Sequence, residues 1–157
     1  MRQVAKSPEY ADVLADEANF LDAASRTELL CDEVVVKDEP LAPGALKYAV
    51  WITRDPALHD VDGFQRYWRE VHGPLGARNP FMRRYVQNHV RRRFYDLGRV
   101  PPFDGITMSW SKDLDELRAS GRSEELRLTV EDQQHFMADP GGAHPFLVVD
   151  ELEVGLG

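Results

Sequence analysis

A chain of 157 residues is long enough for one domain with a substantial hydrophobic core. Its content of 43% apolar and 29% charged residues is typical of a globular protein, and its formal net charge of −8 disfavours binding to nucleic acid or to anionic membranes. A single cysteine, Cys31, excludes an intramolecular disulfide and fits a reducing compartment. We therefore expect a cytoplasmic protein with neither a nucleic-acid partner nor a membrane partner.

The N-terminal 20 residues contain no apolar run typical of a signal peptide. Residues 16–36 instead resemble residues 131–154, because both segments pass from an acidic helical stretch through a phenylalanine and a polar loop to an apolar strand containing Asp-Glu. This similarity predicts that residues 10–36 form a helix and a strand, an αβ half-repeat of the end of the chain, with its strand at a sheet edge. Coincidence between two acidic helix–strand pairs is the alternative.

Residues 45–54, ALKYAVWITR, predict a strand that is apolar on both faces and is therefore covered on both sides. A helix follows, because apolar residues recur after it at helical spacing. They are Phe64, Trp68, Val71 and Leu75. The pair Gly73-Pro74 should break or bend this helix.

Two more strands are expected in the middle of the chain. Residues 81–94 form the second strand, with Tyr85 and His89 on one face and Arg84 on the other. A loop rich in glycine and proline separates it from the third strand, residues 105–111, in which Trp110 lies between two serines.

The last third of the chain predicts helix and then strand. Residues 112–137 suggest two helical pieces interrupted at Ser120-Gly121, and Thr129 has the pattern of a helix start. Residues 145–154 form the fourth strand. The order from Ala45 onward is βαββαβ, which predicts an α+β, ferredoxin-like module. We expect a single domain over residues 1–157, with the half-repeat in residues 1–40 and the module in residues 45–154.

The first helix and the strand after it carry a specific pattern. FQRYWREVHGPLGA followed by RRYVQNH resembles the EthD-like family of the dimeric α+β barrel superfamily. In that family a helix ending in Tyr-Trp-x-x-x-His-x-Pro-Leu precedes a strand containing Arg-Tyr-x-Gln-x-His. The matching residues here are Tyr67, Trp68, His72, Pro74, Leu75, Arg84, Tyr85, Gln87 and His89. The resemblance covers roughly residues 45–154 and is more informative about fold than about reaction.

The resemblance implies a homodimer, or a higher homo-oligomer, whose four-stranded sheets pack face to face as a dimeric α+β barrel with the helices outside. It also implies a pocket between the first helix and the sheet that takes a small-molecule substrate, and acid–base chemistry without a metal or an organic cofactor. Relatives act on lactones, polyketides and aromatic-pathway intermediates, and others are accessory proteins without an assigned reaction. The N-terminal half-repeat departs from the short form of the family.

His72 is the leading catalytic candidate. It lies at the edge of the apolar stripe one turn after Trp68, and an imidazole exchanges protons near neutral pH. The alternative is a residue at a helix end that contacts the last carbonyl groups. The family motif favours the catalytic role.

Tyr85 and His89 are the other catalytic candidates, because they share one strand face and would polarise a substrate carbonyl or enolate. A buried tyrosine that only satisfies its own hydroxyl is the alternative. The candidate substrate-binding residues are Trp51, Tyr67, Trp68, Arg84 and Trp110. Aromatic side chains at this spacing also occur in ordinary cores, and an arginine is often simply solvated.

Other kinds of site have little support. His59, His135 and His144 have no spacing typical of a metal site, and no phosphate-binding or nucleophile motif occurs. The sequence therefore predicts a cofactor-independent lyase or isomerase, of the dehydratase, decarboxylase or cyclase type, that acts on a small cyclic or aromatic polyketide-like intermediate. A non-catalytic small-molecule-binding or accessory protein of a degradation pathway is the alternative.

Overall fold

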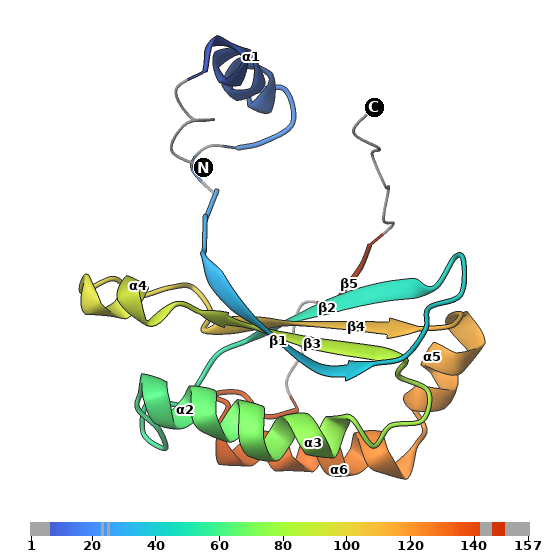
Figure 1. Ribbon diagram of the computed structural model, residues 1–157. Helices are drawn as coiled ribbons and strands as arrows, with labels where there is room; N and C mark the ends of the chain where they lie inside the picture. Colours follow the sequence, from blue (N-terminus) through green and yellow to red (C-terminus); the bar gives the residue numbers. More distant parts are fainter. Residues whose placement is uncertain (1–6, 23, 25, 142–145, 150–157) are drawn as a thin grey trace.

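The computed structural model describes residues 7–22, 24, 26–141 and 146–149. Its centre is a five-stranded sheet in the order β1-β3-β4-β2-β5, in which every neighbouring pair is antiparallel (Figure 1). The strands are β1 (Cys31–Asp38), β2 (Leu46–Ile52), β3 (Arg84–Val90), β4 (Gly105–Ser111) and β5 (Phe146–Val149). The order β3-β4-β2-β5 is that of a ferredoxin-like βαββαβ module, which confirms the predicted α+β class.

Helices cover one face of this sheet. They are α2 (Val61–Tyr67), the π-helical segment η2 (Trp68–His72), α3 (Gly73–Gly76), α5 (Leu114–Ser120), α6 (Glu124–Asp132) and the 3-10 turn η3 (Gln133–His135). The short helix α4 (Arg92–Asp96) lies at one end of the sheet, and α1 (Pro8–Glu17) stands off on the opposite side from the helical layer (Figure 1). Among the described residues, no helix lies flat against that second face of the sheet. None of the described helices has the length and apolar content needed to cross a bilayer.

The N-terminal segment folds as a helix and a strand, as predicted. Ser7 caps α1 by accepting a hydrogen bond from the backbone N–H of Tyr10. Strand β1 pairs with β3 and so extends the sheet at an edge, as expected. Cys31 begins this strand but is only half-buried, because β1 is the edge strand. The proposed superposition on the end of the chain stays a prediction, since much of residues 142–157 lies outside the described residues.

Two predicted boundaries are wrong. The expected strand 81–94 is shorter, because β3 ends at Val90 and Arg92 begins α4. The expected helix start at Thr129 is the middle of α6, which begins at Glu124 with Ser123 as its N-cap. The fourth strand is present at Phe146–Val149, and the other residues of the predicted range 145–154 lie outside the described residues. Strand β4 and the interruption between α5 and α6 are placed as predicted.

The sequence predicts a break or a bend at Gly73-Pro74, and the structure shows no break, because α2, η2 and α3 follow one another directly. The chain widens into the π-helical turn η2, in which the backbone N–H of Gly73 bonds to the carbonyl of Trp68, five residues earlier. Pro74 then occupies the first turn of α3, where its missing N–H costs little. The wider turn also changes which side chains face inwards: His72 is buried, whereas Val71 is 48% exposed.

The core lies between the sheet and the helices. Its centre is Phe64, Trp68 and Phe136, all fully buried, with Ile52 and Met137 beside them. The rings of Phe64 and Trp68 stack with their centroids 5.5 Å apart. Trp68 thus fixes η2 against the sheet.

The contact between Trp68 and strand β4 depends on a glycine. A Cβ atom on Gly105 would lie 2.5 Å from Trp68 Cζ3 and 2.7 Å from the carbonyl oxygen of Asn88, so neither side has room. We expect Gly105→Ala to lower the free energy of unfolding by about 1–3 kcal/mol through overpacking. Urea denaturation measures this change. Gly121→Ala is the matched control, because its Cβ would meet the Arg118 carbonyl oxygen at 3.4 Å, and we expect a change within about 0.5 kcal/mol. Equal effects of the two substitutions would contradict the prediction.

Candidate active site

His72 forms a hydrogen-bonded cluster with residues from two helices. Its Nδ1 lies 2.8 Å from Oδ2 of Asp132, the last residue of α6. The hydroxyl of Tyr67 donates to the other carboxylate oxygen of Asp132 at 2.7 Å. The imidazole also packs on Phe136, with the ring centroids 4.6 Å apart. One carboxylate therefore orients both His72 and Tyr67.

The charge on Asp132 determines which nitrogen of His72 carries the proton. Burial acts to raise the pKa of Asp132, but hydrogen bonds from His72 and Tyr67 outweigh burial and hold this pKa below its usual value. An ionised carboxylate only accepts, so Nδ1 of His72 carries a hydrogen and donates it. In the neutral ring Nε2 is then free to accept a proton. Burial and the nearby Asp132 carboxylate raise the pKa of Tyr67 to about 12, which keeps it a donor.

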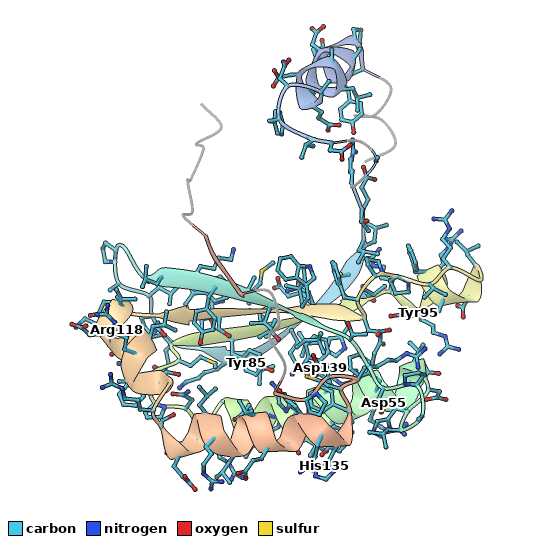
Figure 2. All side chains as sticks on the ribbon, turned by 180° about the vertical axis from the view of Figure 1, so that it is seen from behind. Asp55, Tyr85, Tyr95, Arg118, His135 and Asp139 are labelled. Atoms are coloured by element: carbon cyan, nitrogen blue, oxygen red, sulfur yellow. The ribbon has the colours of Figure 1, made fainter. Side chains whose placement is uncertain are left out.

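A second cluster follows one face of β3. Gln87 donates from Nε2 to the carbonyl of Trp68 at 2.8 Å and to the hydroxyl oxygen of Tyr85 at 2.9 Å. Its Oε1 lies 3.0 Å from Nε2 of His89. Figure 2 shows Tyr85 on the side of the sheet that the helices cover. Burial raises the pKa of Tyr85 to about 12, so its hydroxyl stays protonated. Because Gln87 is the donor in their hydrogen bond, the hydroxyl hydrogen of Tyr85 does not point to Gln87.

His89 has an unpaired ring nitrogen. Because Oε1 of Gln87 accepts, Nε2 of His89 carries the hydrogen, and Nδ1 is a buried acceptor without a partner in the described part of the chain. The ring packs on Trp68 at 4.3 Å between centroids. This tautomer offers a substrate an acceptor and no free donor, so the expected polarising role is left to Tyr85.

The state of His89 should make stability depend on pH. Burial, with a smaller contribution from Arg69, lowers the pKa of His89 from 6.5 to about 4. In the unfolded chain His89 therefore binds a proton below pH 6.5, whereas in the native protein it binds one only below about pH 4. We expect this group to remove about 3 kcal/mol of stability as the pH falls through that window.

Urea denaturation at several pH values between 7 and 4 measures this effect. His89→Gln should lose stability less steeply than the wild type, whereas His135→Gln, an exposed histidine, should follow the wild-type slope. Parallel slopes for wild type and His89→Gln would rule out the buried neutral state.

The structure divides the predicted site residues between the two faces of the sheet. Tyr67, Trp68, His72, Tyr85 and His89 lie between the sheet and the helices. Trp51, Arg84 and Trp110 lie on the opposite face, because side chains alternate along a strand. Arg84 stacks on Trp110, with its guanidinium carbon 5.1 Å from the ring centroid. These three residues therefore do not share a pocket with His72 inside one chain, contrary to the prediction.

The buried residues also form two clusters and not one. In the described part of the chain, no hydrogen bond or ring contact joins His72 directly to Tyr85 or His89. Sequence reasoning missed Asp132 as the partner of His72, and it gave Gln87, which joins Tyr85 to His89, no role. Gln87 was visible in the motif; Asp132 had no local signal, because it lies 60 residues from His72.

Two of the remaining histidines, His59 and His135, contact each other. Nε2 of His59 lies 3.0 Å from the carbonyl oxygen of His135, and His144 lies outside the described residues. Within the described ranges, no group of three or more histidine, cysteine, aspartate or glutamate side chains is close enough to hold one metal ion.

The sheet order and the helical layer define an α+β protein of the ferredoxin-like type, with a histidine–carboxylate pair between η2 and α6. The family model described as the EthD domain matches residues 59–140, which span α2, both clusters and α6. The chain therefore belongs to the EthD domain family. Among solved structures, the chain is similar to an "ethyl tert-butyl ether d (ethd) family protein" from Bacillus halodurans C-125, at 14% identity and a TM-score of 0.53. The match covers 69% of this chain and 99% of that one. A comparison with curated proteins finds no match.

Proposed function

We propose that the protein is a cofactor-independent lyase or isomerase in which His72 is the general base. The observation that carries this proposal is the 2.8 Å contact between His72 Nδ1 and Asp132, which holds the ring in one tautomer. The free Nε2 lone pair takes a proton from a carbon next to a carbonyl group, and Asp132 stabilises the imidazolium that forms. Gln87 donates to the hydroxyl oxygen of Tyr85, so the O–H of Tyr85 is not donated to Gln87. This O–H donates to the enolate oxygen.

The surroundings favour a small, flat and largely apolar substrate. Tyr67 and Phe136 place aromatic rings around the His72–Asp132 pair, and such rings pack well on cyclic or aromatic molecules. A cyclic or aromatic polyketide-like intermediate with an acidified C–H bond meets these requirements. Dehydration, decarboxylation and ring closure all begin from the enolate that such a base produces.

The burial of the site favours a second candidate function. His72, Tyr85 and His89 are 5%, 3% and 4% exposed, so a substrate reaches them only if a covering element moves. A protein that binds a small molecule without transforming it, as an accessory to a degradation pathway, needs no accessible base. The two functions differ in whether protons are exchanged.

Deuterium incorporation tests this difference without knowledge of the true substrate. The wild-type protein is incubated in D₂O with a panel of cyclic ketones, unsaturated lactones and aromatic polyketide analogues, and exchange of the α-hydrogen is followed by NMR. The proposal expects accelerated exchange for at least one member. Binding of panel members, seen as a rise in Tm, with no exchange for any of them would favour the non-catalytic protein.

We also propose that the subunits form a homodimer through the face of the sheet that no described helix covers. A row of apolar residues crosses four neighbouring strands on this face. The row is Val35, Val86, Met108 and Ala49. A continuous apolar row on a sheet face is stabilised when a second sheet packs on it. Light scattering should give about twice the chain mass of 17.9 kDa, and a monomer at micromolar concentration would contradict the dimer.

A further inference from the structure

The N-terminal arm, defined here as residues 7–22, exposes four large apolar side chains. No residue of α1 is buried. Val13, Leu14, Phe20 and Leu21 are 52%, 45%, 68% and 43% exposed. Leu14 and Leu21 line one shallow hollow together with Ala18 and three charged residues, whereas Val13 and Phe20 lie outside this hollow. Large apolar side chains gathered on an exposed arm mark a surface that contacts another molecule.

The arm points away from its own body. In both views α1 lies on the side of the sheet opposite the helical layer, the side on which a second sheet would pack (Figures 1 and 2). The exit direction is fixed, because the backbone N–H of Arg91 donates to the carbonyl of Leu30 at 3.0 Å and extends the pairing of β1 with β3. A salt bridge of 2.8 Å between Arg91 and Asp32 supports the same turn of the chain.

A surface of matching chemistry lies beside the start of β1. The arginine hollow, about 480 Å³, is lined by Glu28, Leu30, Arg91, Arg93, Phe94, Leu97 and Arg99. The guanidinium of Arg99 lies over the Phe94 ring, 5.7 Å from its centroid. In the described part of the chain, neither Arg93 nor Arg99 forms a salt bridge, although the protein carries a net charge of −8. The hollow thus combines an apolar floor with two unpaired positive charges.

We propose that the N-terminal arm of a second copy of this chain fills the arginine hollow. Val13 of the arm packs on Phe94 and Leu97, and Asp12 and Asp16, on the adjacent face of α1, lie next to Arg93 and Arg99. In a two-fold dimer the exchange is reciprocal, so each subunit gives one arm and receives one. The inference rests on the sheet-to-sheet dimer proposed above. It adds a second contact between the subunits, made by the arm, which lies outside residues 59–140.

The second copy is the occupant that the geometry favours. The arm of the same chain does not fill the hollow in the structure, because its residues Leu14, Ala18 and Leu21 line a separate hollow. The arm instead extends on the side of the partner sheet. Its charge is opposite to that of the hollow, since α1 carries Glu9, Asp12, Asp16 and Glu17 and no basic residue.

Cross-linking between two different chains tests the exchange. In a Cys31→Ser background, which removes the only native thiol, a chain with Val13→Cys is mixed with a tagged chain with Leu97→Cys and mildly oxidised. We expect a disulfide-linked heterodimer. The matched control replaces Leu97→Cys with Leu58→Cys, an exposed leucine (50%) outside the hollow, and should give little product. Equal yields, no heterodimer, or closure within one chain that carries both cysteines would overturn the proposal.

Charge exchange provides an independent measurement. Arg93→Glu with Arg99→Glu, or Asp12→Arg with Asp16→Arg, should weaken the dimer about 10-fold in sedimentation equilibrium, because two ion pairs are lost. All four substitutions in one chain should restore most of the affinity. If the wild-type protein is a monomer, the sheet-to-sheet dimer itself fails. If it is a dimer whose Kd none of these variants changes, only the arm exchange fails.

Discussion

Replacement of His72 by alanine should lower the rate of the catalysed proton exchange by ~10²–10⁴-fold, the usual loss for a positioned general base. The reason is that Nε2 of His72 has its lone pair free while Nδ1 is held by Asp132. The fold should persist, because Asp132 keeps its hydrogen bond from Tyr67 and the lost ring contacts mainly Phe136. The rate is measured on whichever panel compound the wild type exchanges, and circular dichroism checks the fold.

Two further variants make the result specific to proton transfer. His72→Gln preserves much of the shape and the contact with Asp132, but an amide does not accept the proton, so we expect a similar loss. His135→Ala removes an exposed histidine from the same part of the chain and should leave the rate within a factor of about two. Near-full activity of both His72 variants would show that His72 is a structural partner of Asp132 and not the base.

The sequence predicts the sheet well because the strands have local signals. Residues 105–111 alternate in the manner of a half-buried strand, and β4 covers the same residues. β2 is a central strand, as its apolar residues suggest, but the described helices cover only one face, so the covering of its second face stays a prediction. The faces of β3 were also predictable, since alternation alone separates Tyr85 and His89 from Arg84.

The turn before β3 was not predictable in the same way. A Gly-Pro pair ordinarily ends a helix, and a regular period of 3.6 residues places Val71 on the buried side. The π-helical turn adds a residue, so His72 takes the inward place and Val71 faces solvent. The Trp68 carbonyl accepts from both Gly73 and Gln87, and the second bond depends on tertiary structure that no local pattern reveals.

The candidate site was predictable only in part for a related reason. His72, Tyr85 and His89 belong to one short motif, but Asp132 reaches His72 only because α6 packs beside α3. The grouping of Trp51 and Trp110 with the histidines failed because it considered aromatic character without strand parity. Side chains alternate between the two faces along a strand, and the register of strand pairing decides which residues of neighbouring strands share a face.

Replacement of Trp68 by alanine should lower the free energy of unfolding by about 3–5 kcal/mol, the usual cost of removing a large buried aromatic side chain. Trp68 is fully buried, stacks on Phe64, packs on His89 and fills the space that Gly105 leaves open. Its loss leaves a cavity between η2 and the sheet that these rigid neighbours close only partly.

Urea denaturation followed by far-UV circular dichroism measures the change. Val71→Ala, in the same π-helical segment but 48% exposed, is the matched control and should change stability by less than about 0.5 kcal/mol. Because both substitutions alter η2, a large loss confined to Trp68→Ala assigns the stability to packing and not to helix propensity. A Trp68→Ala protein within about 1 kcal/mol of the wild type would mean that η2 is held to the sheet mainly by the Gln87 hydrogen bond to the Trp68 carbonyl.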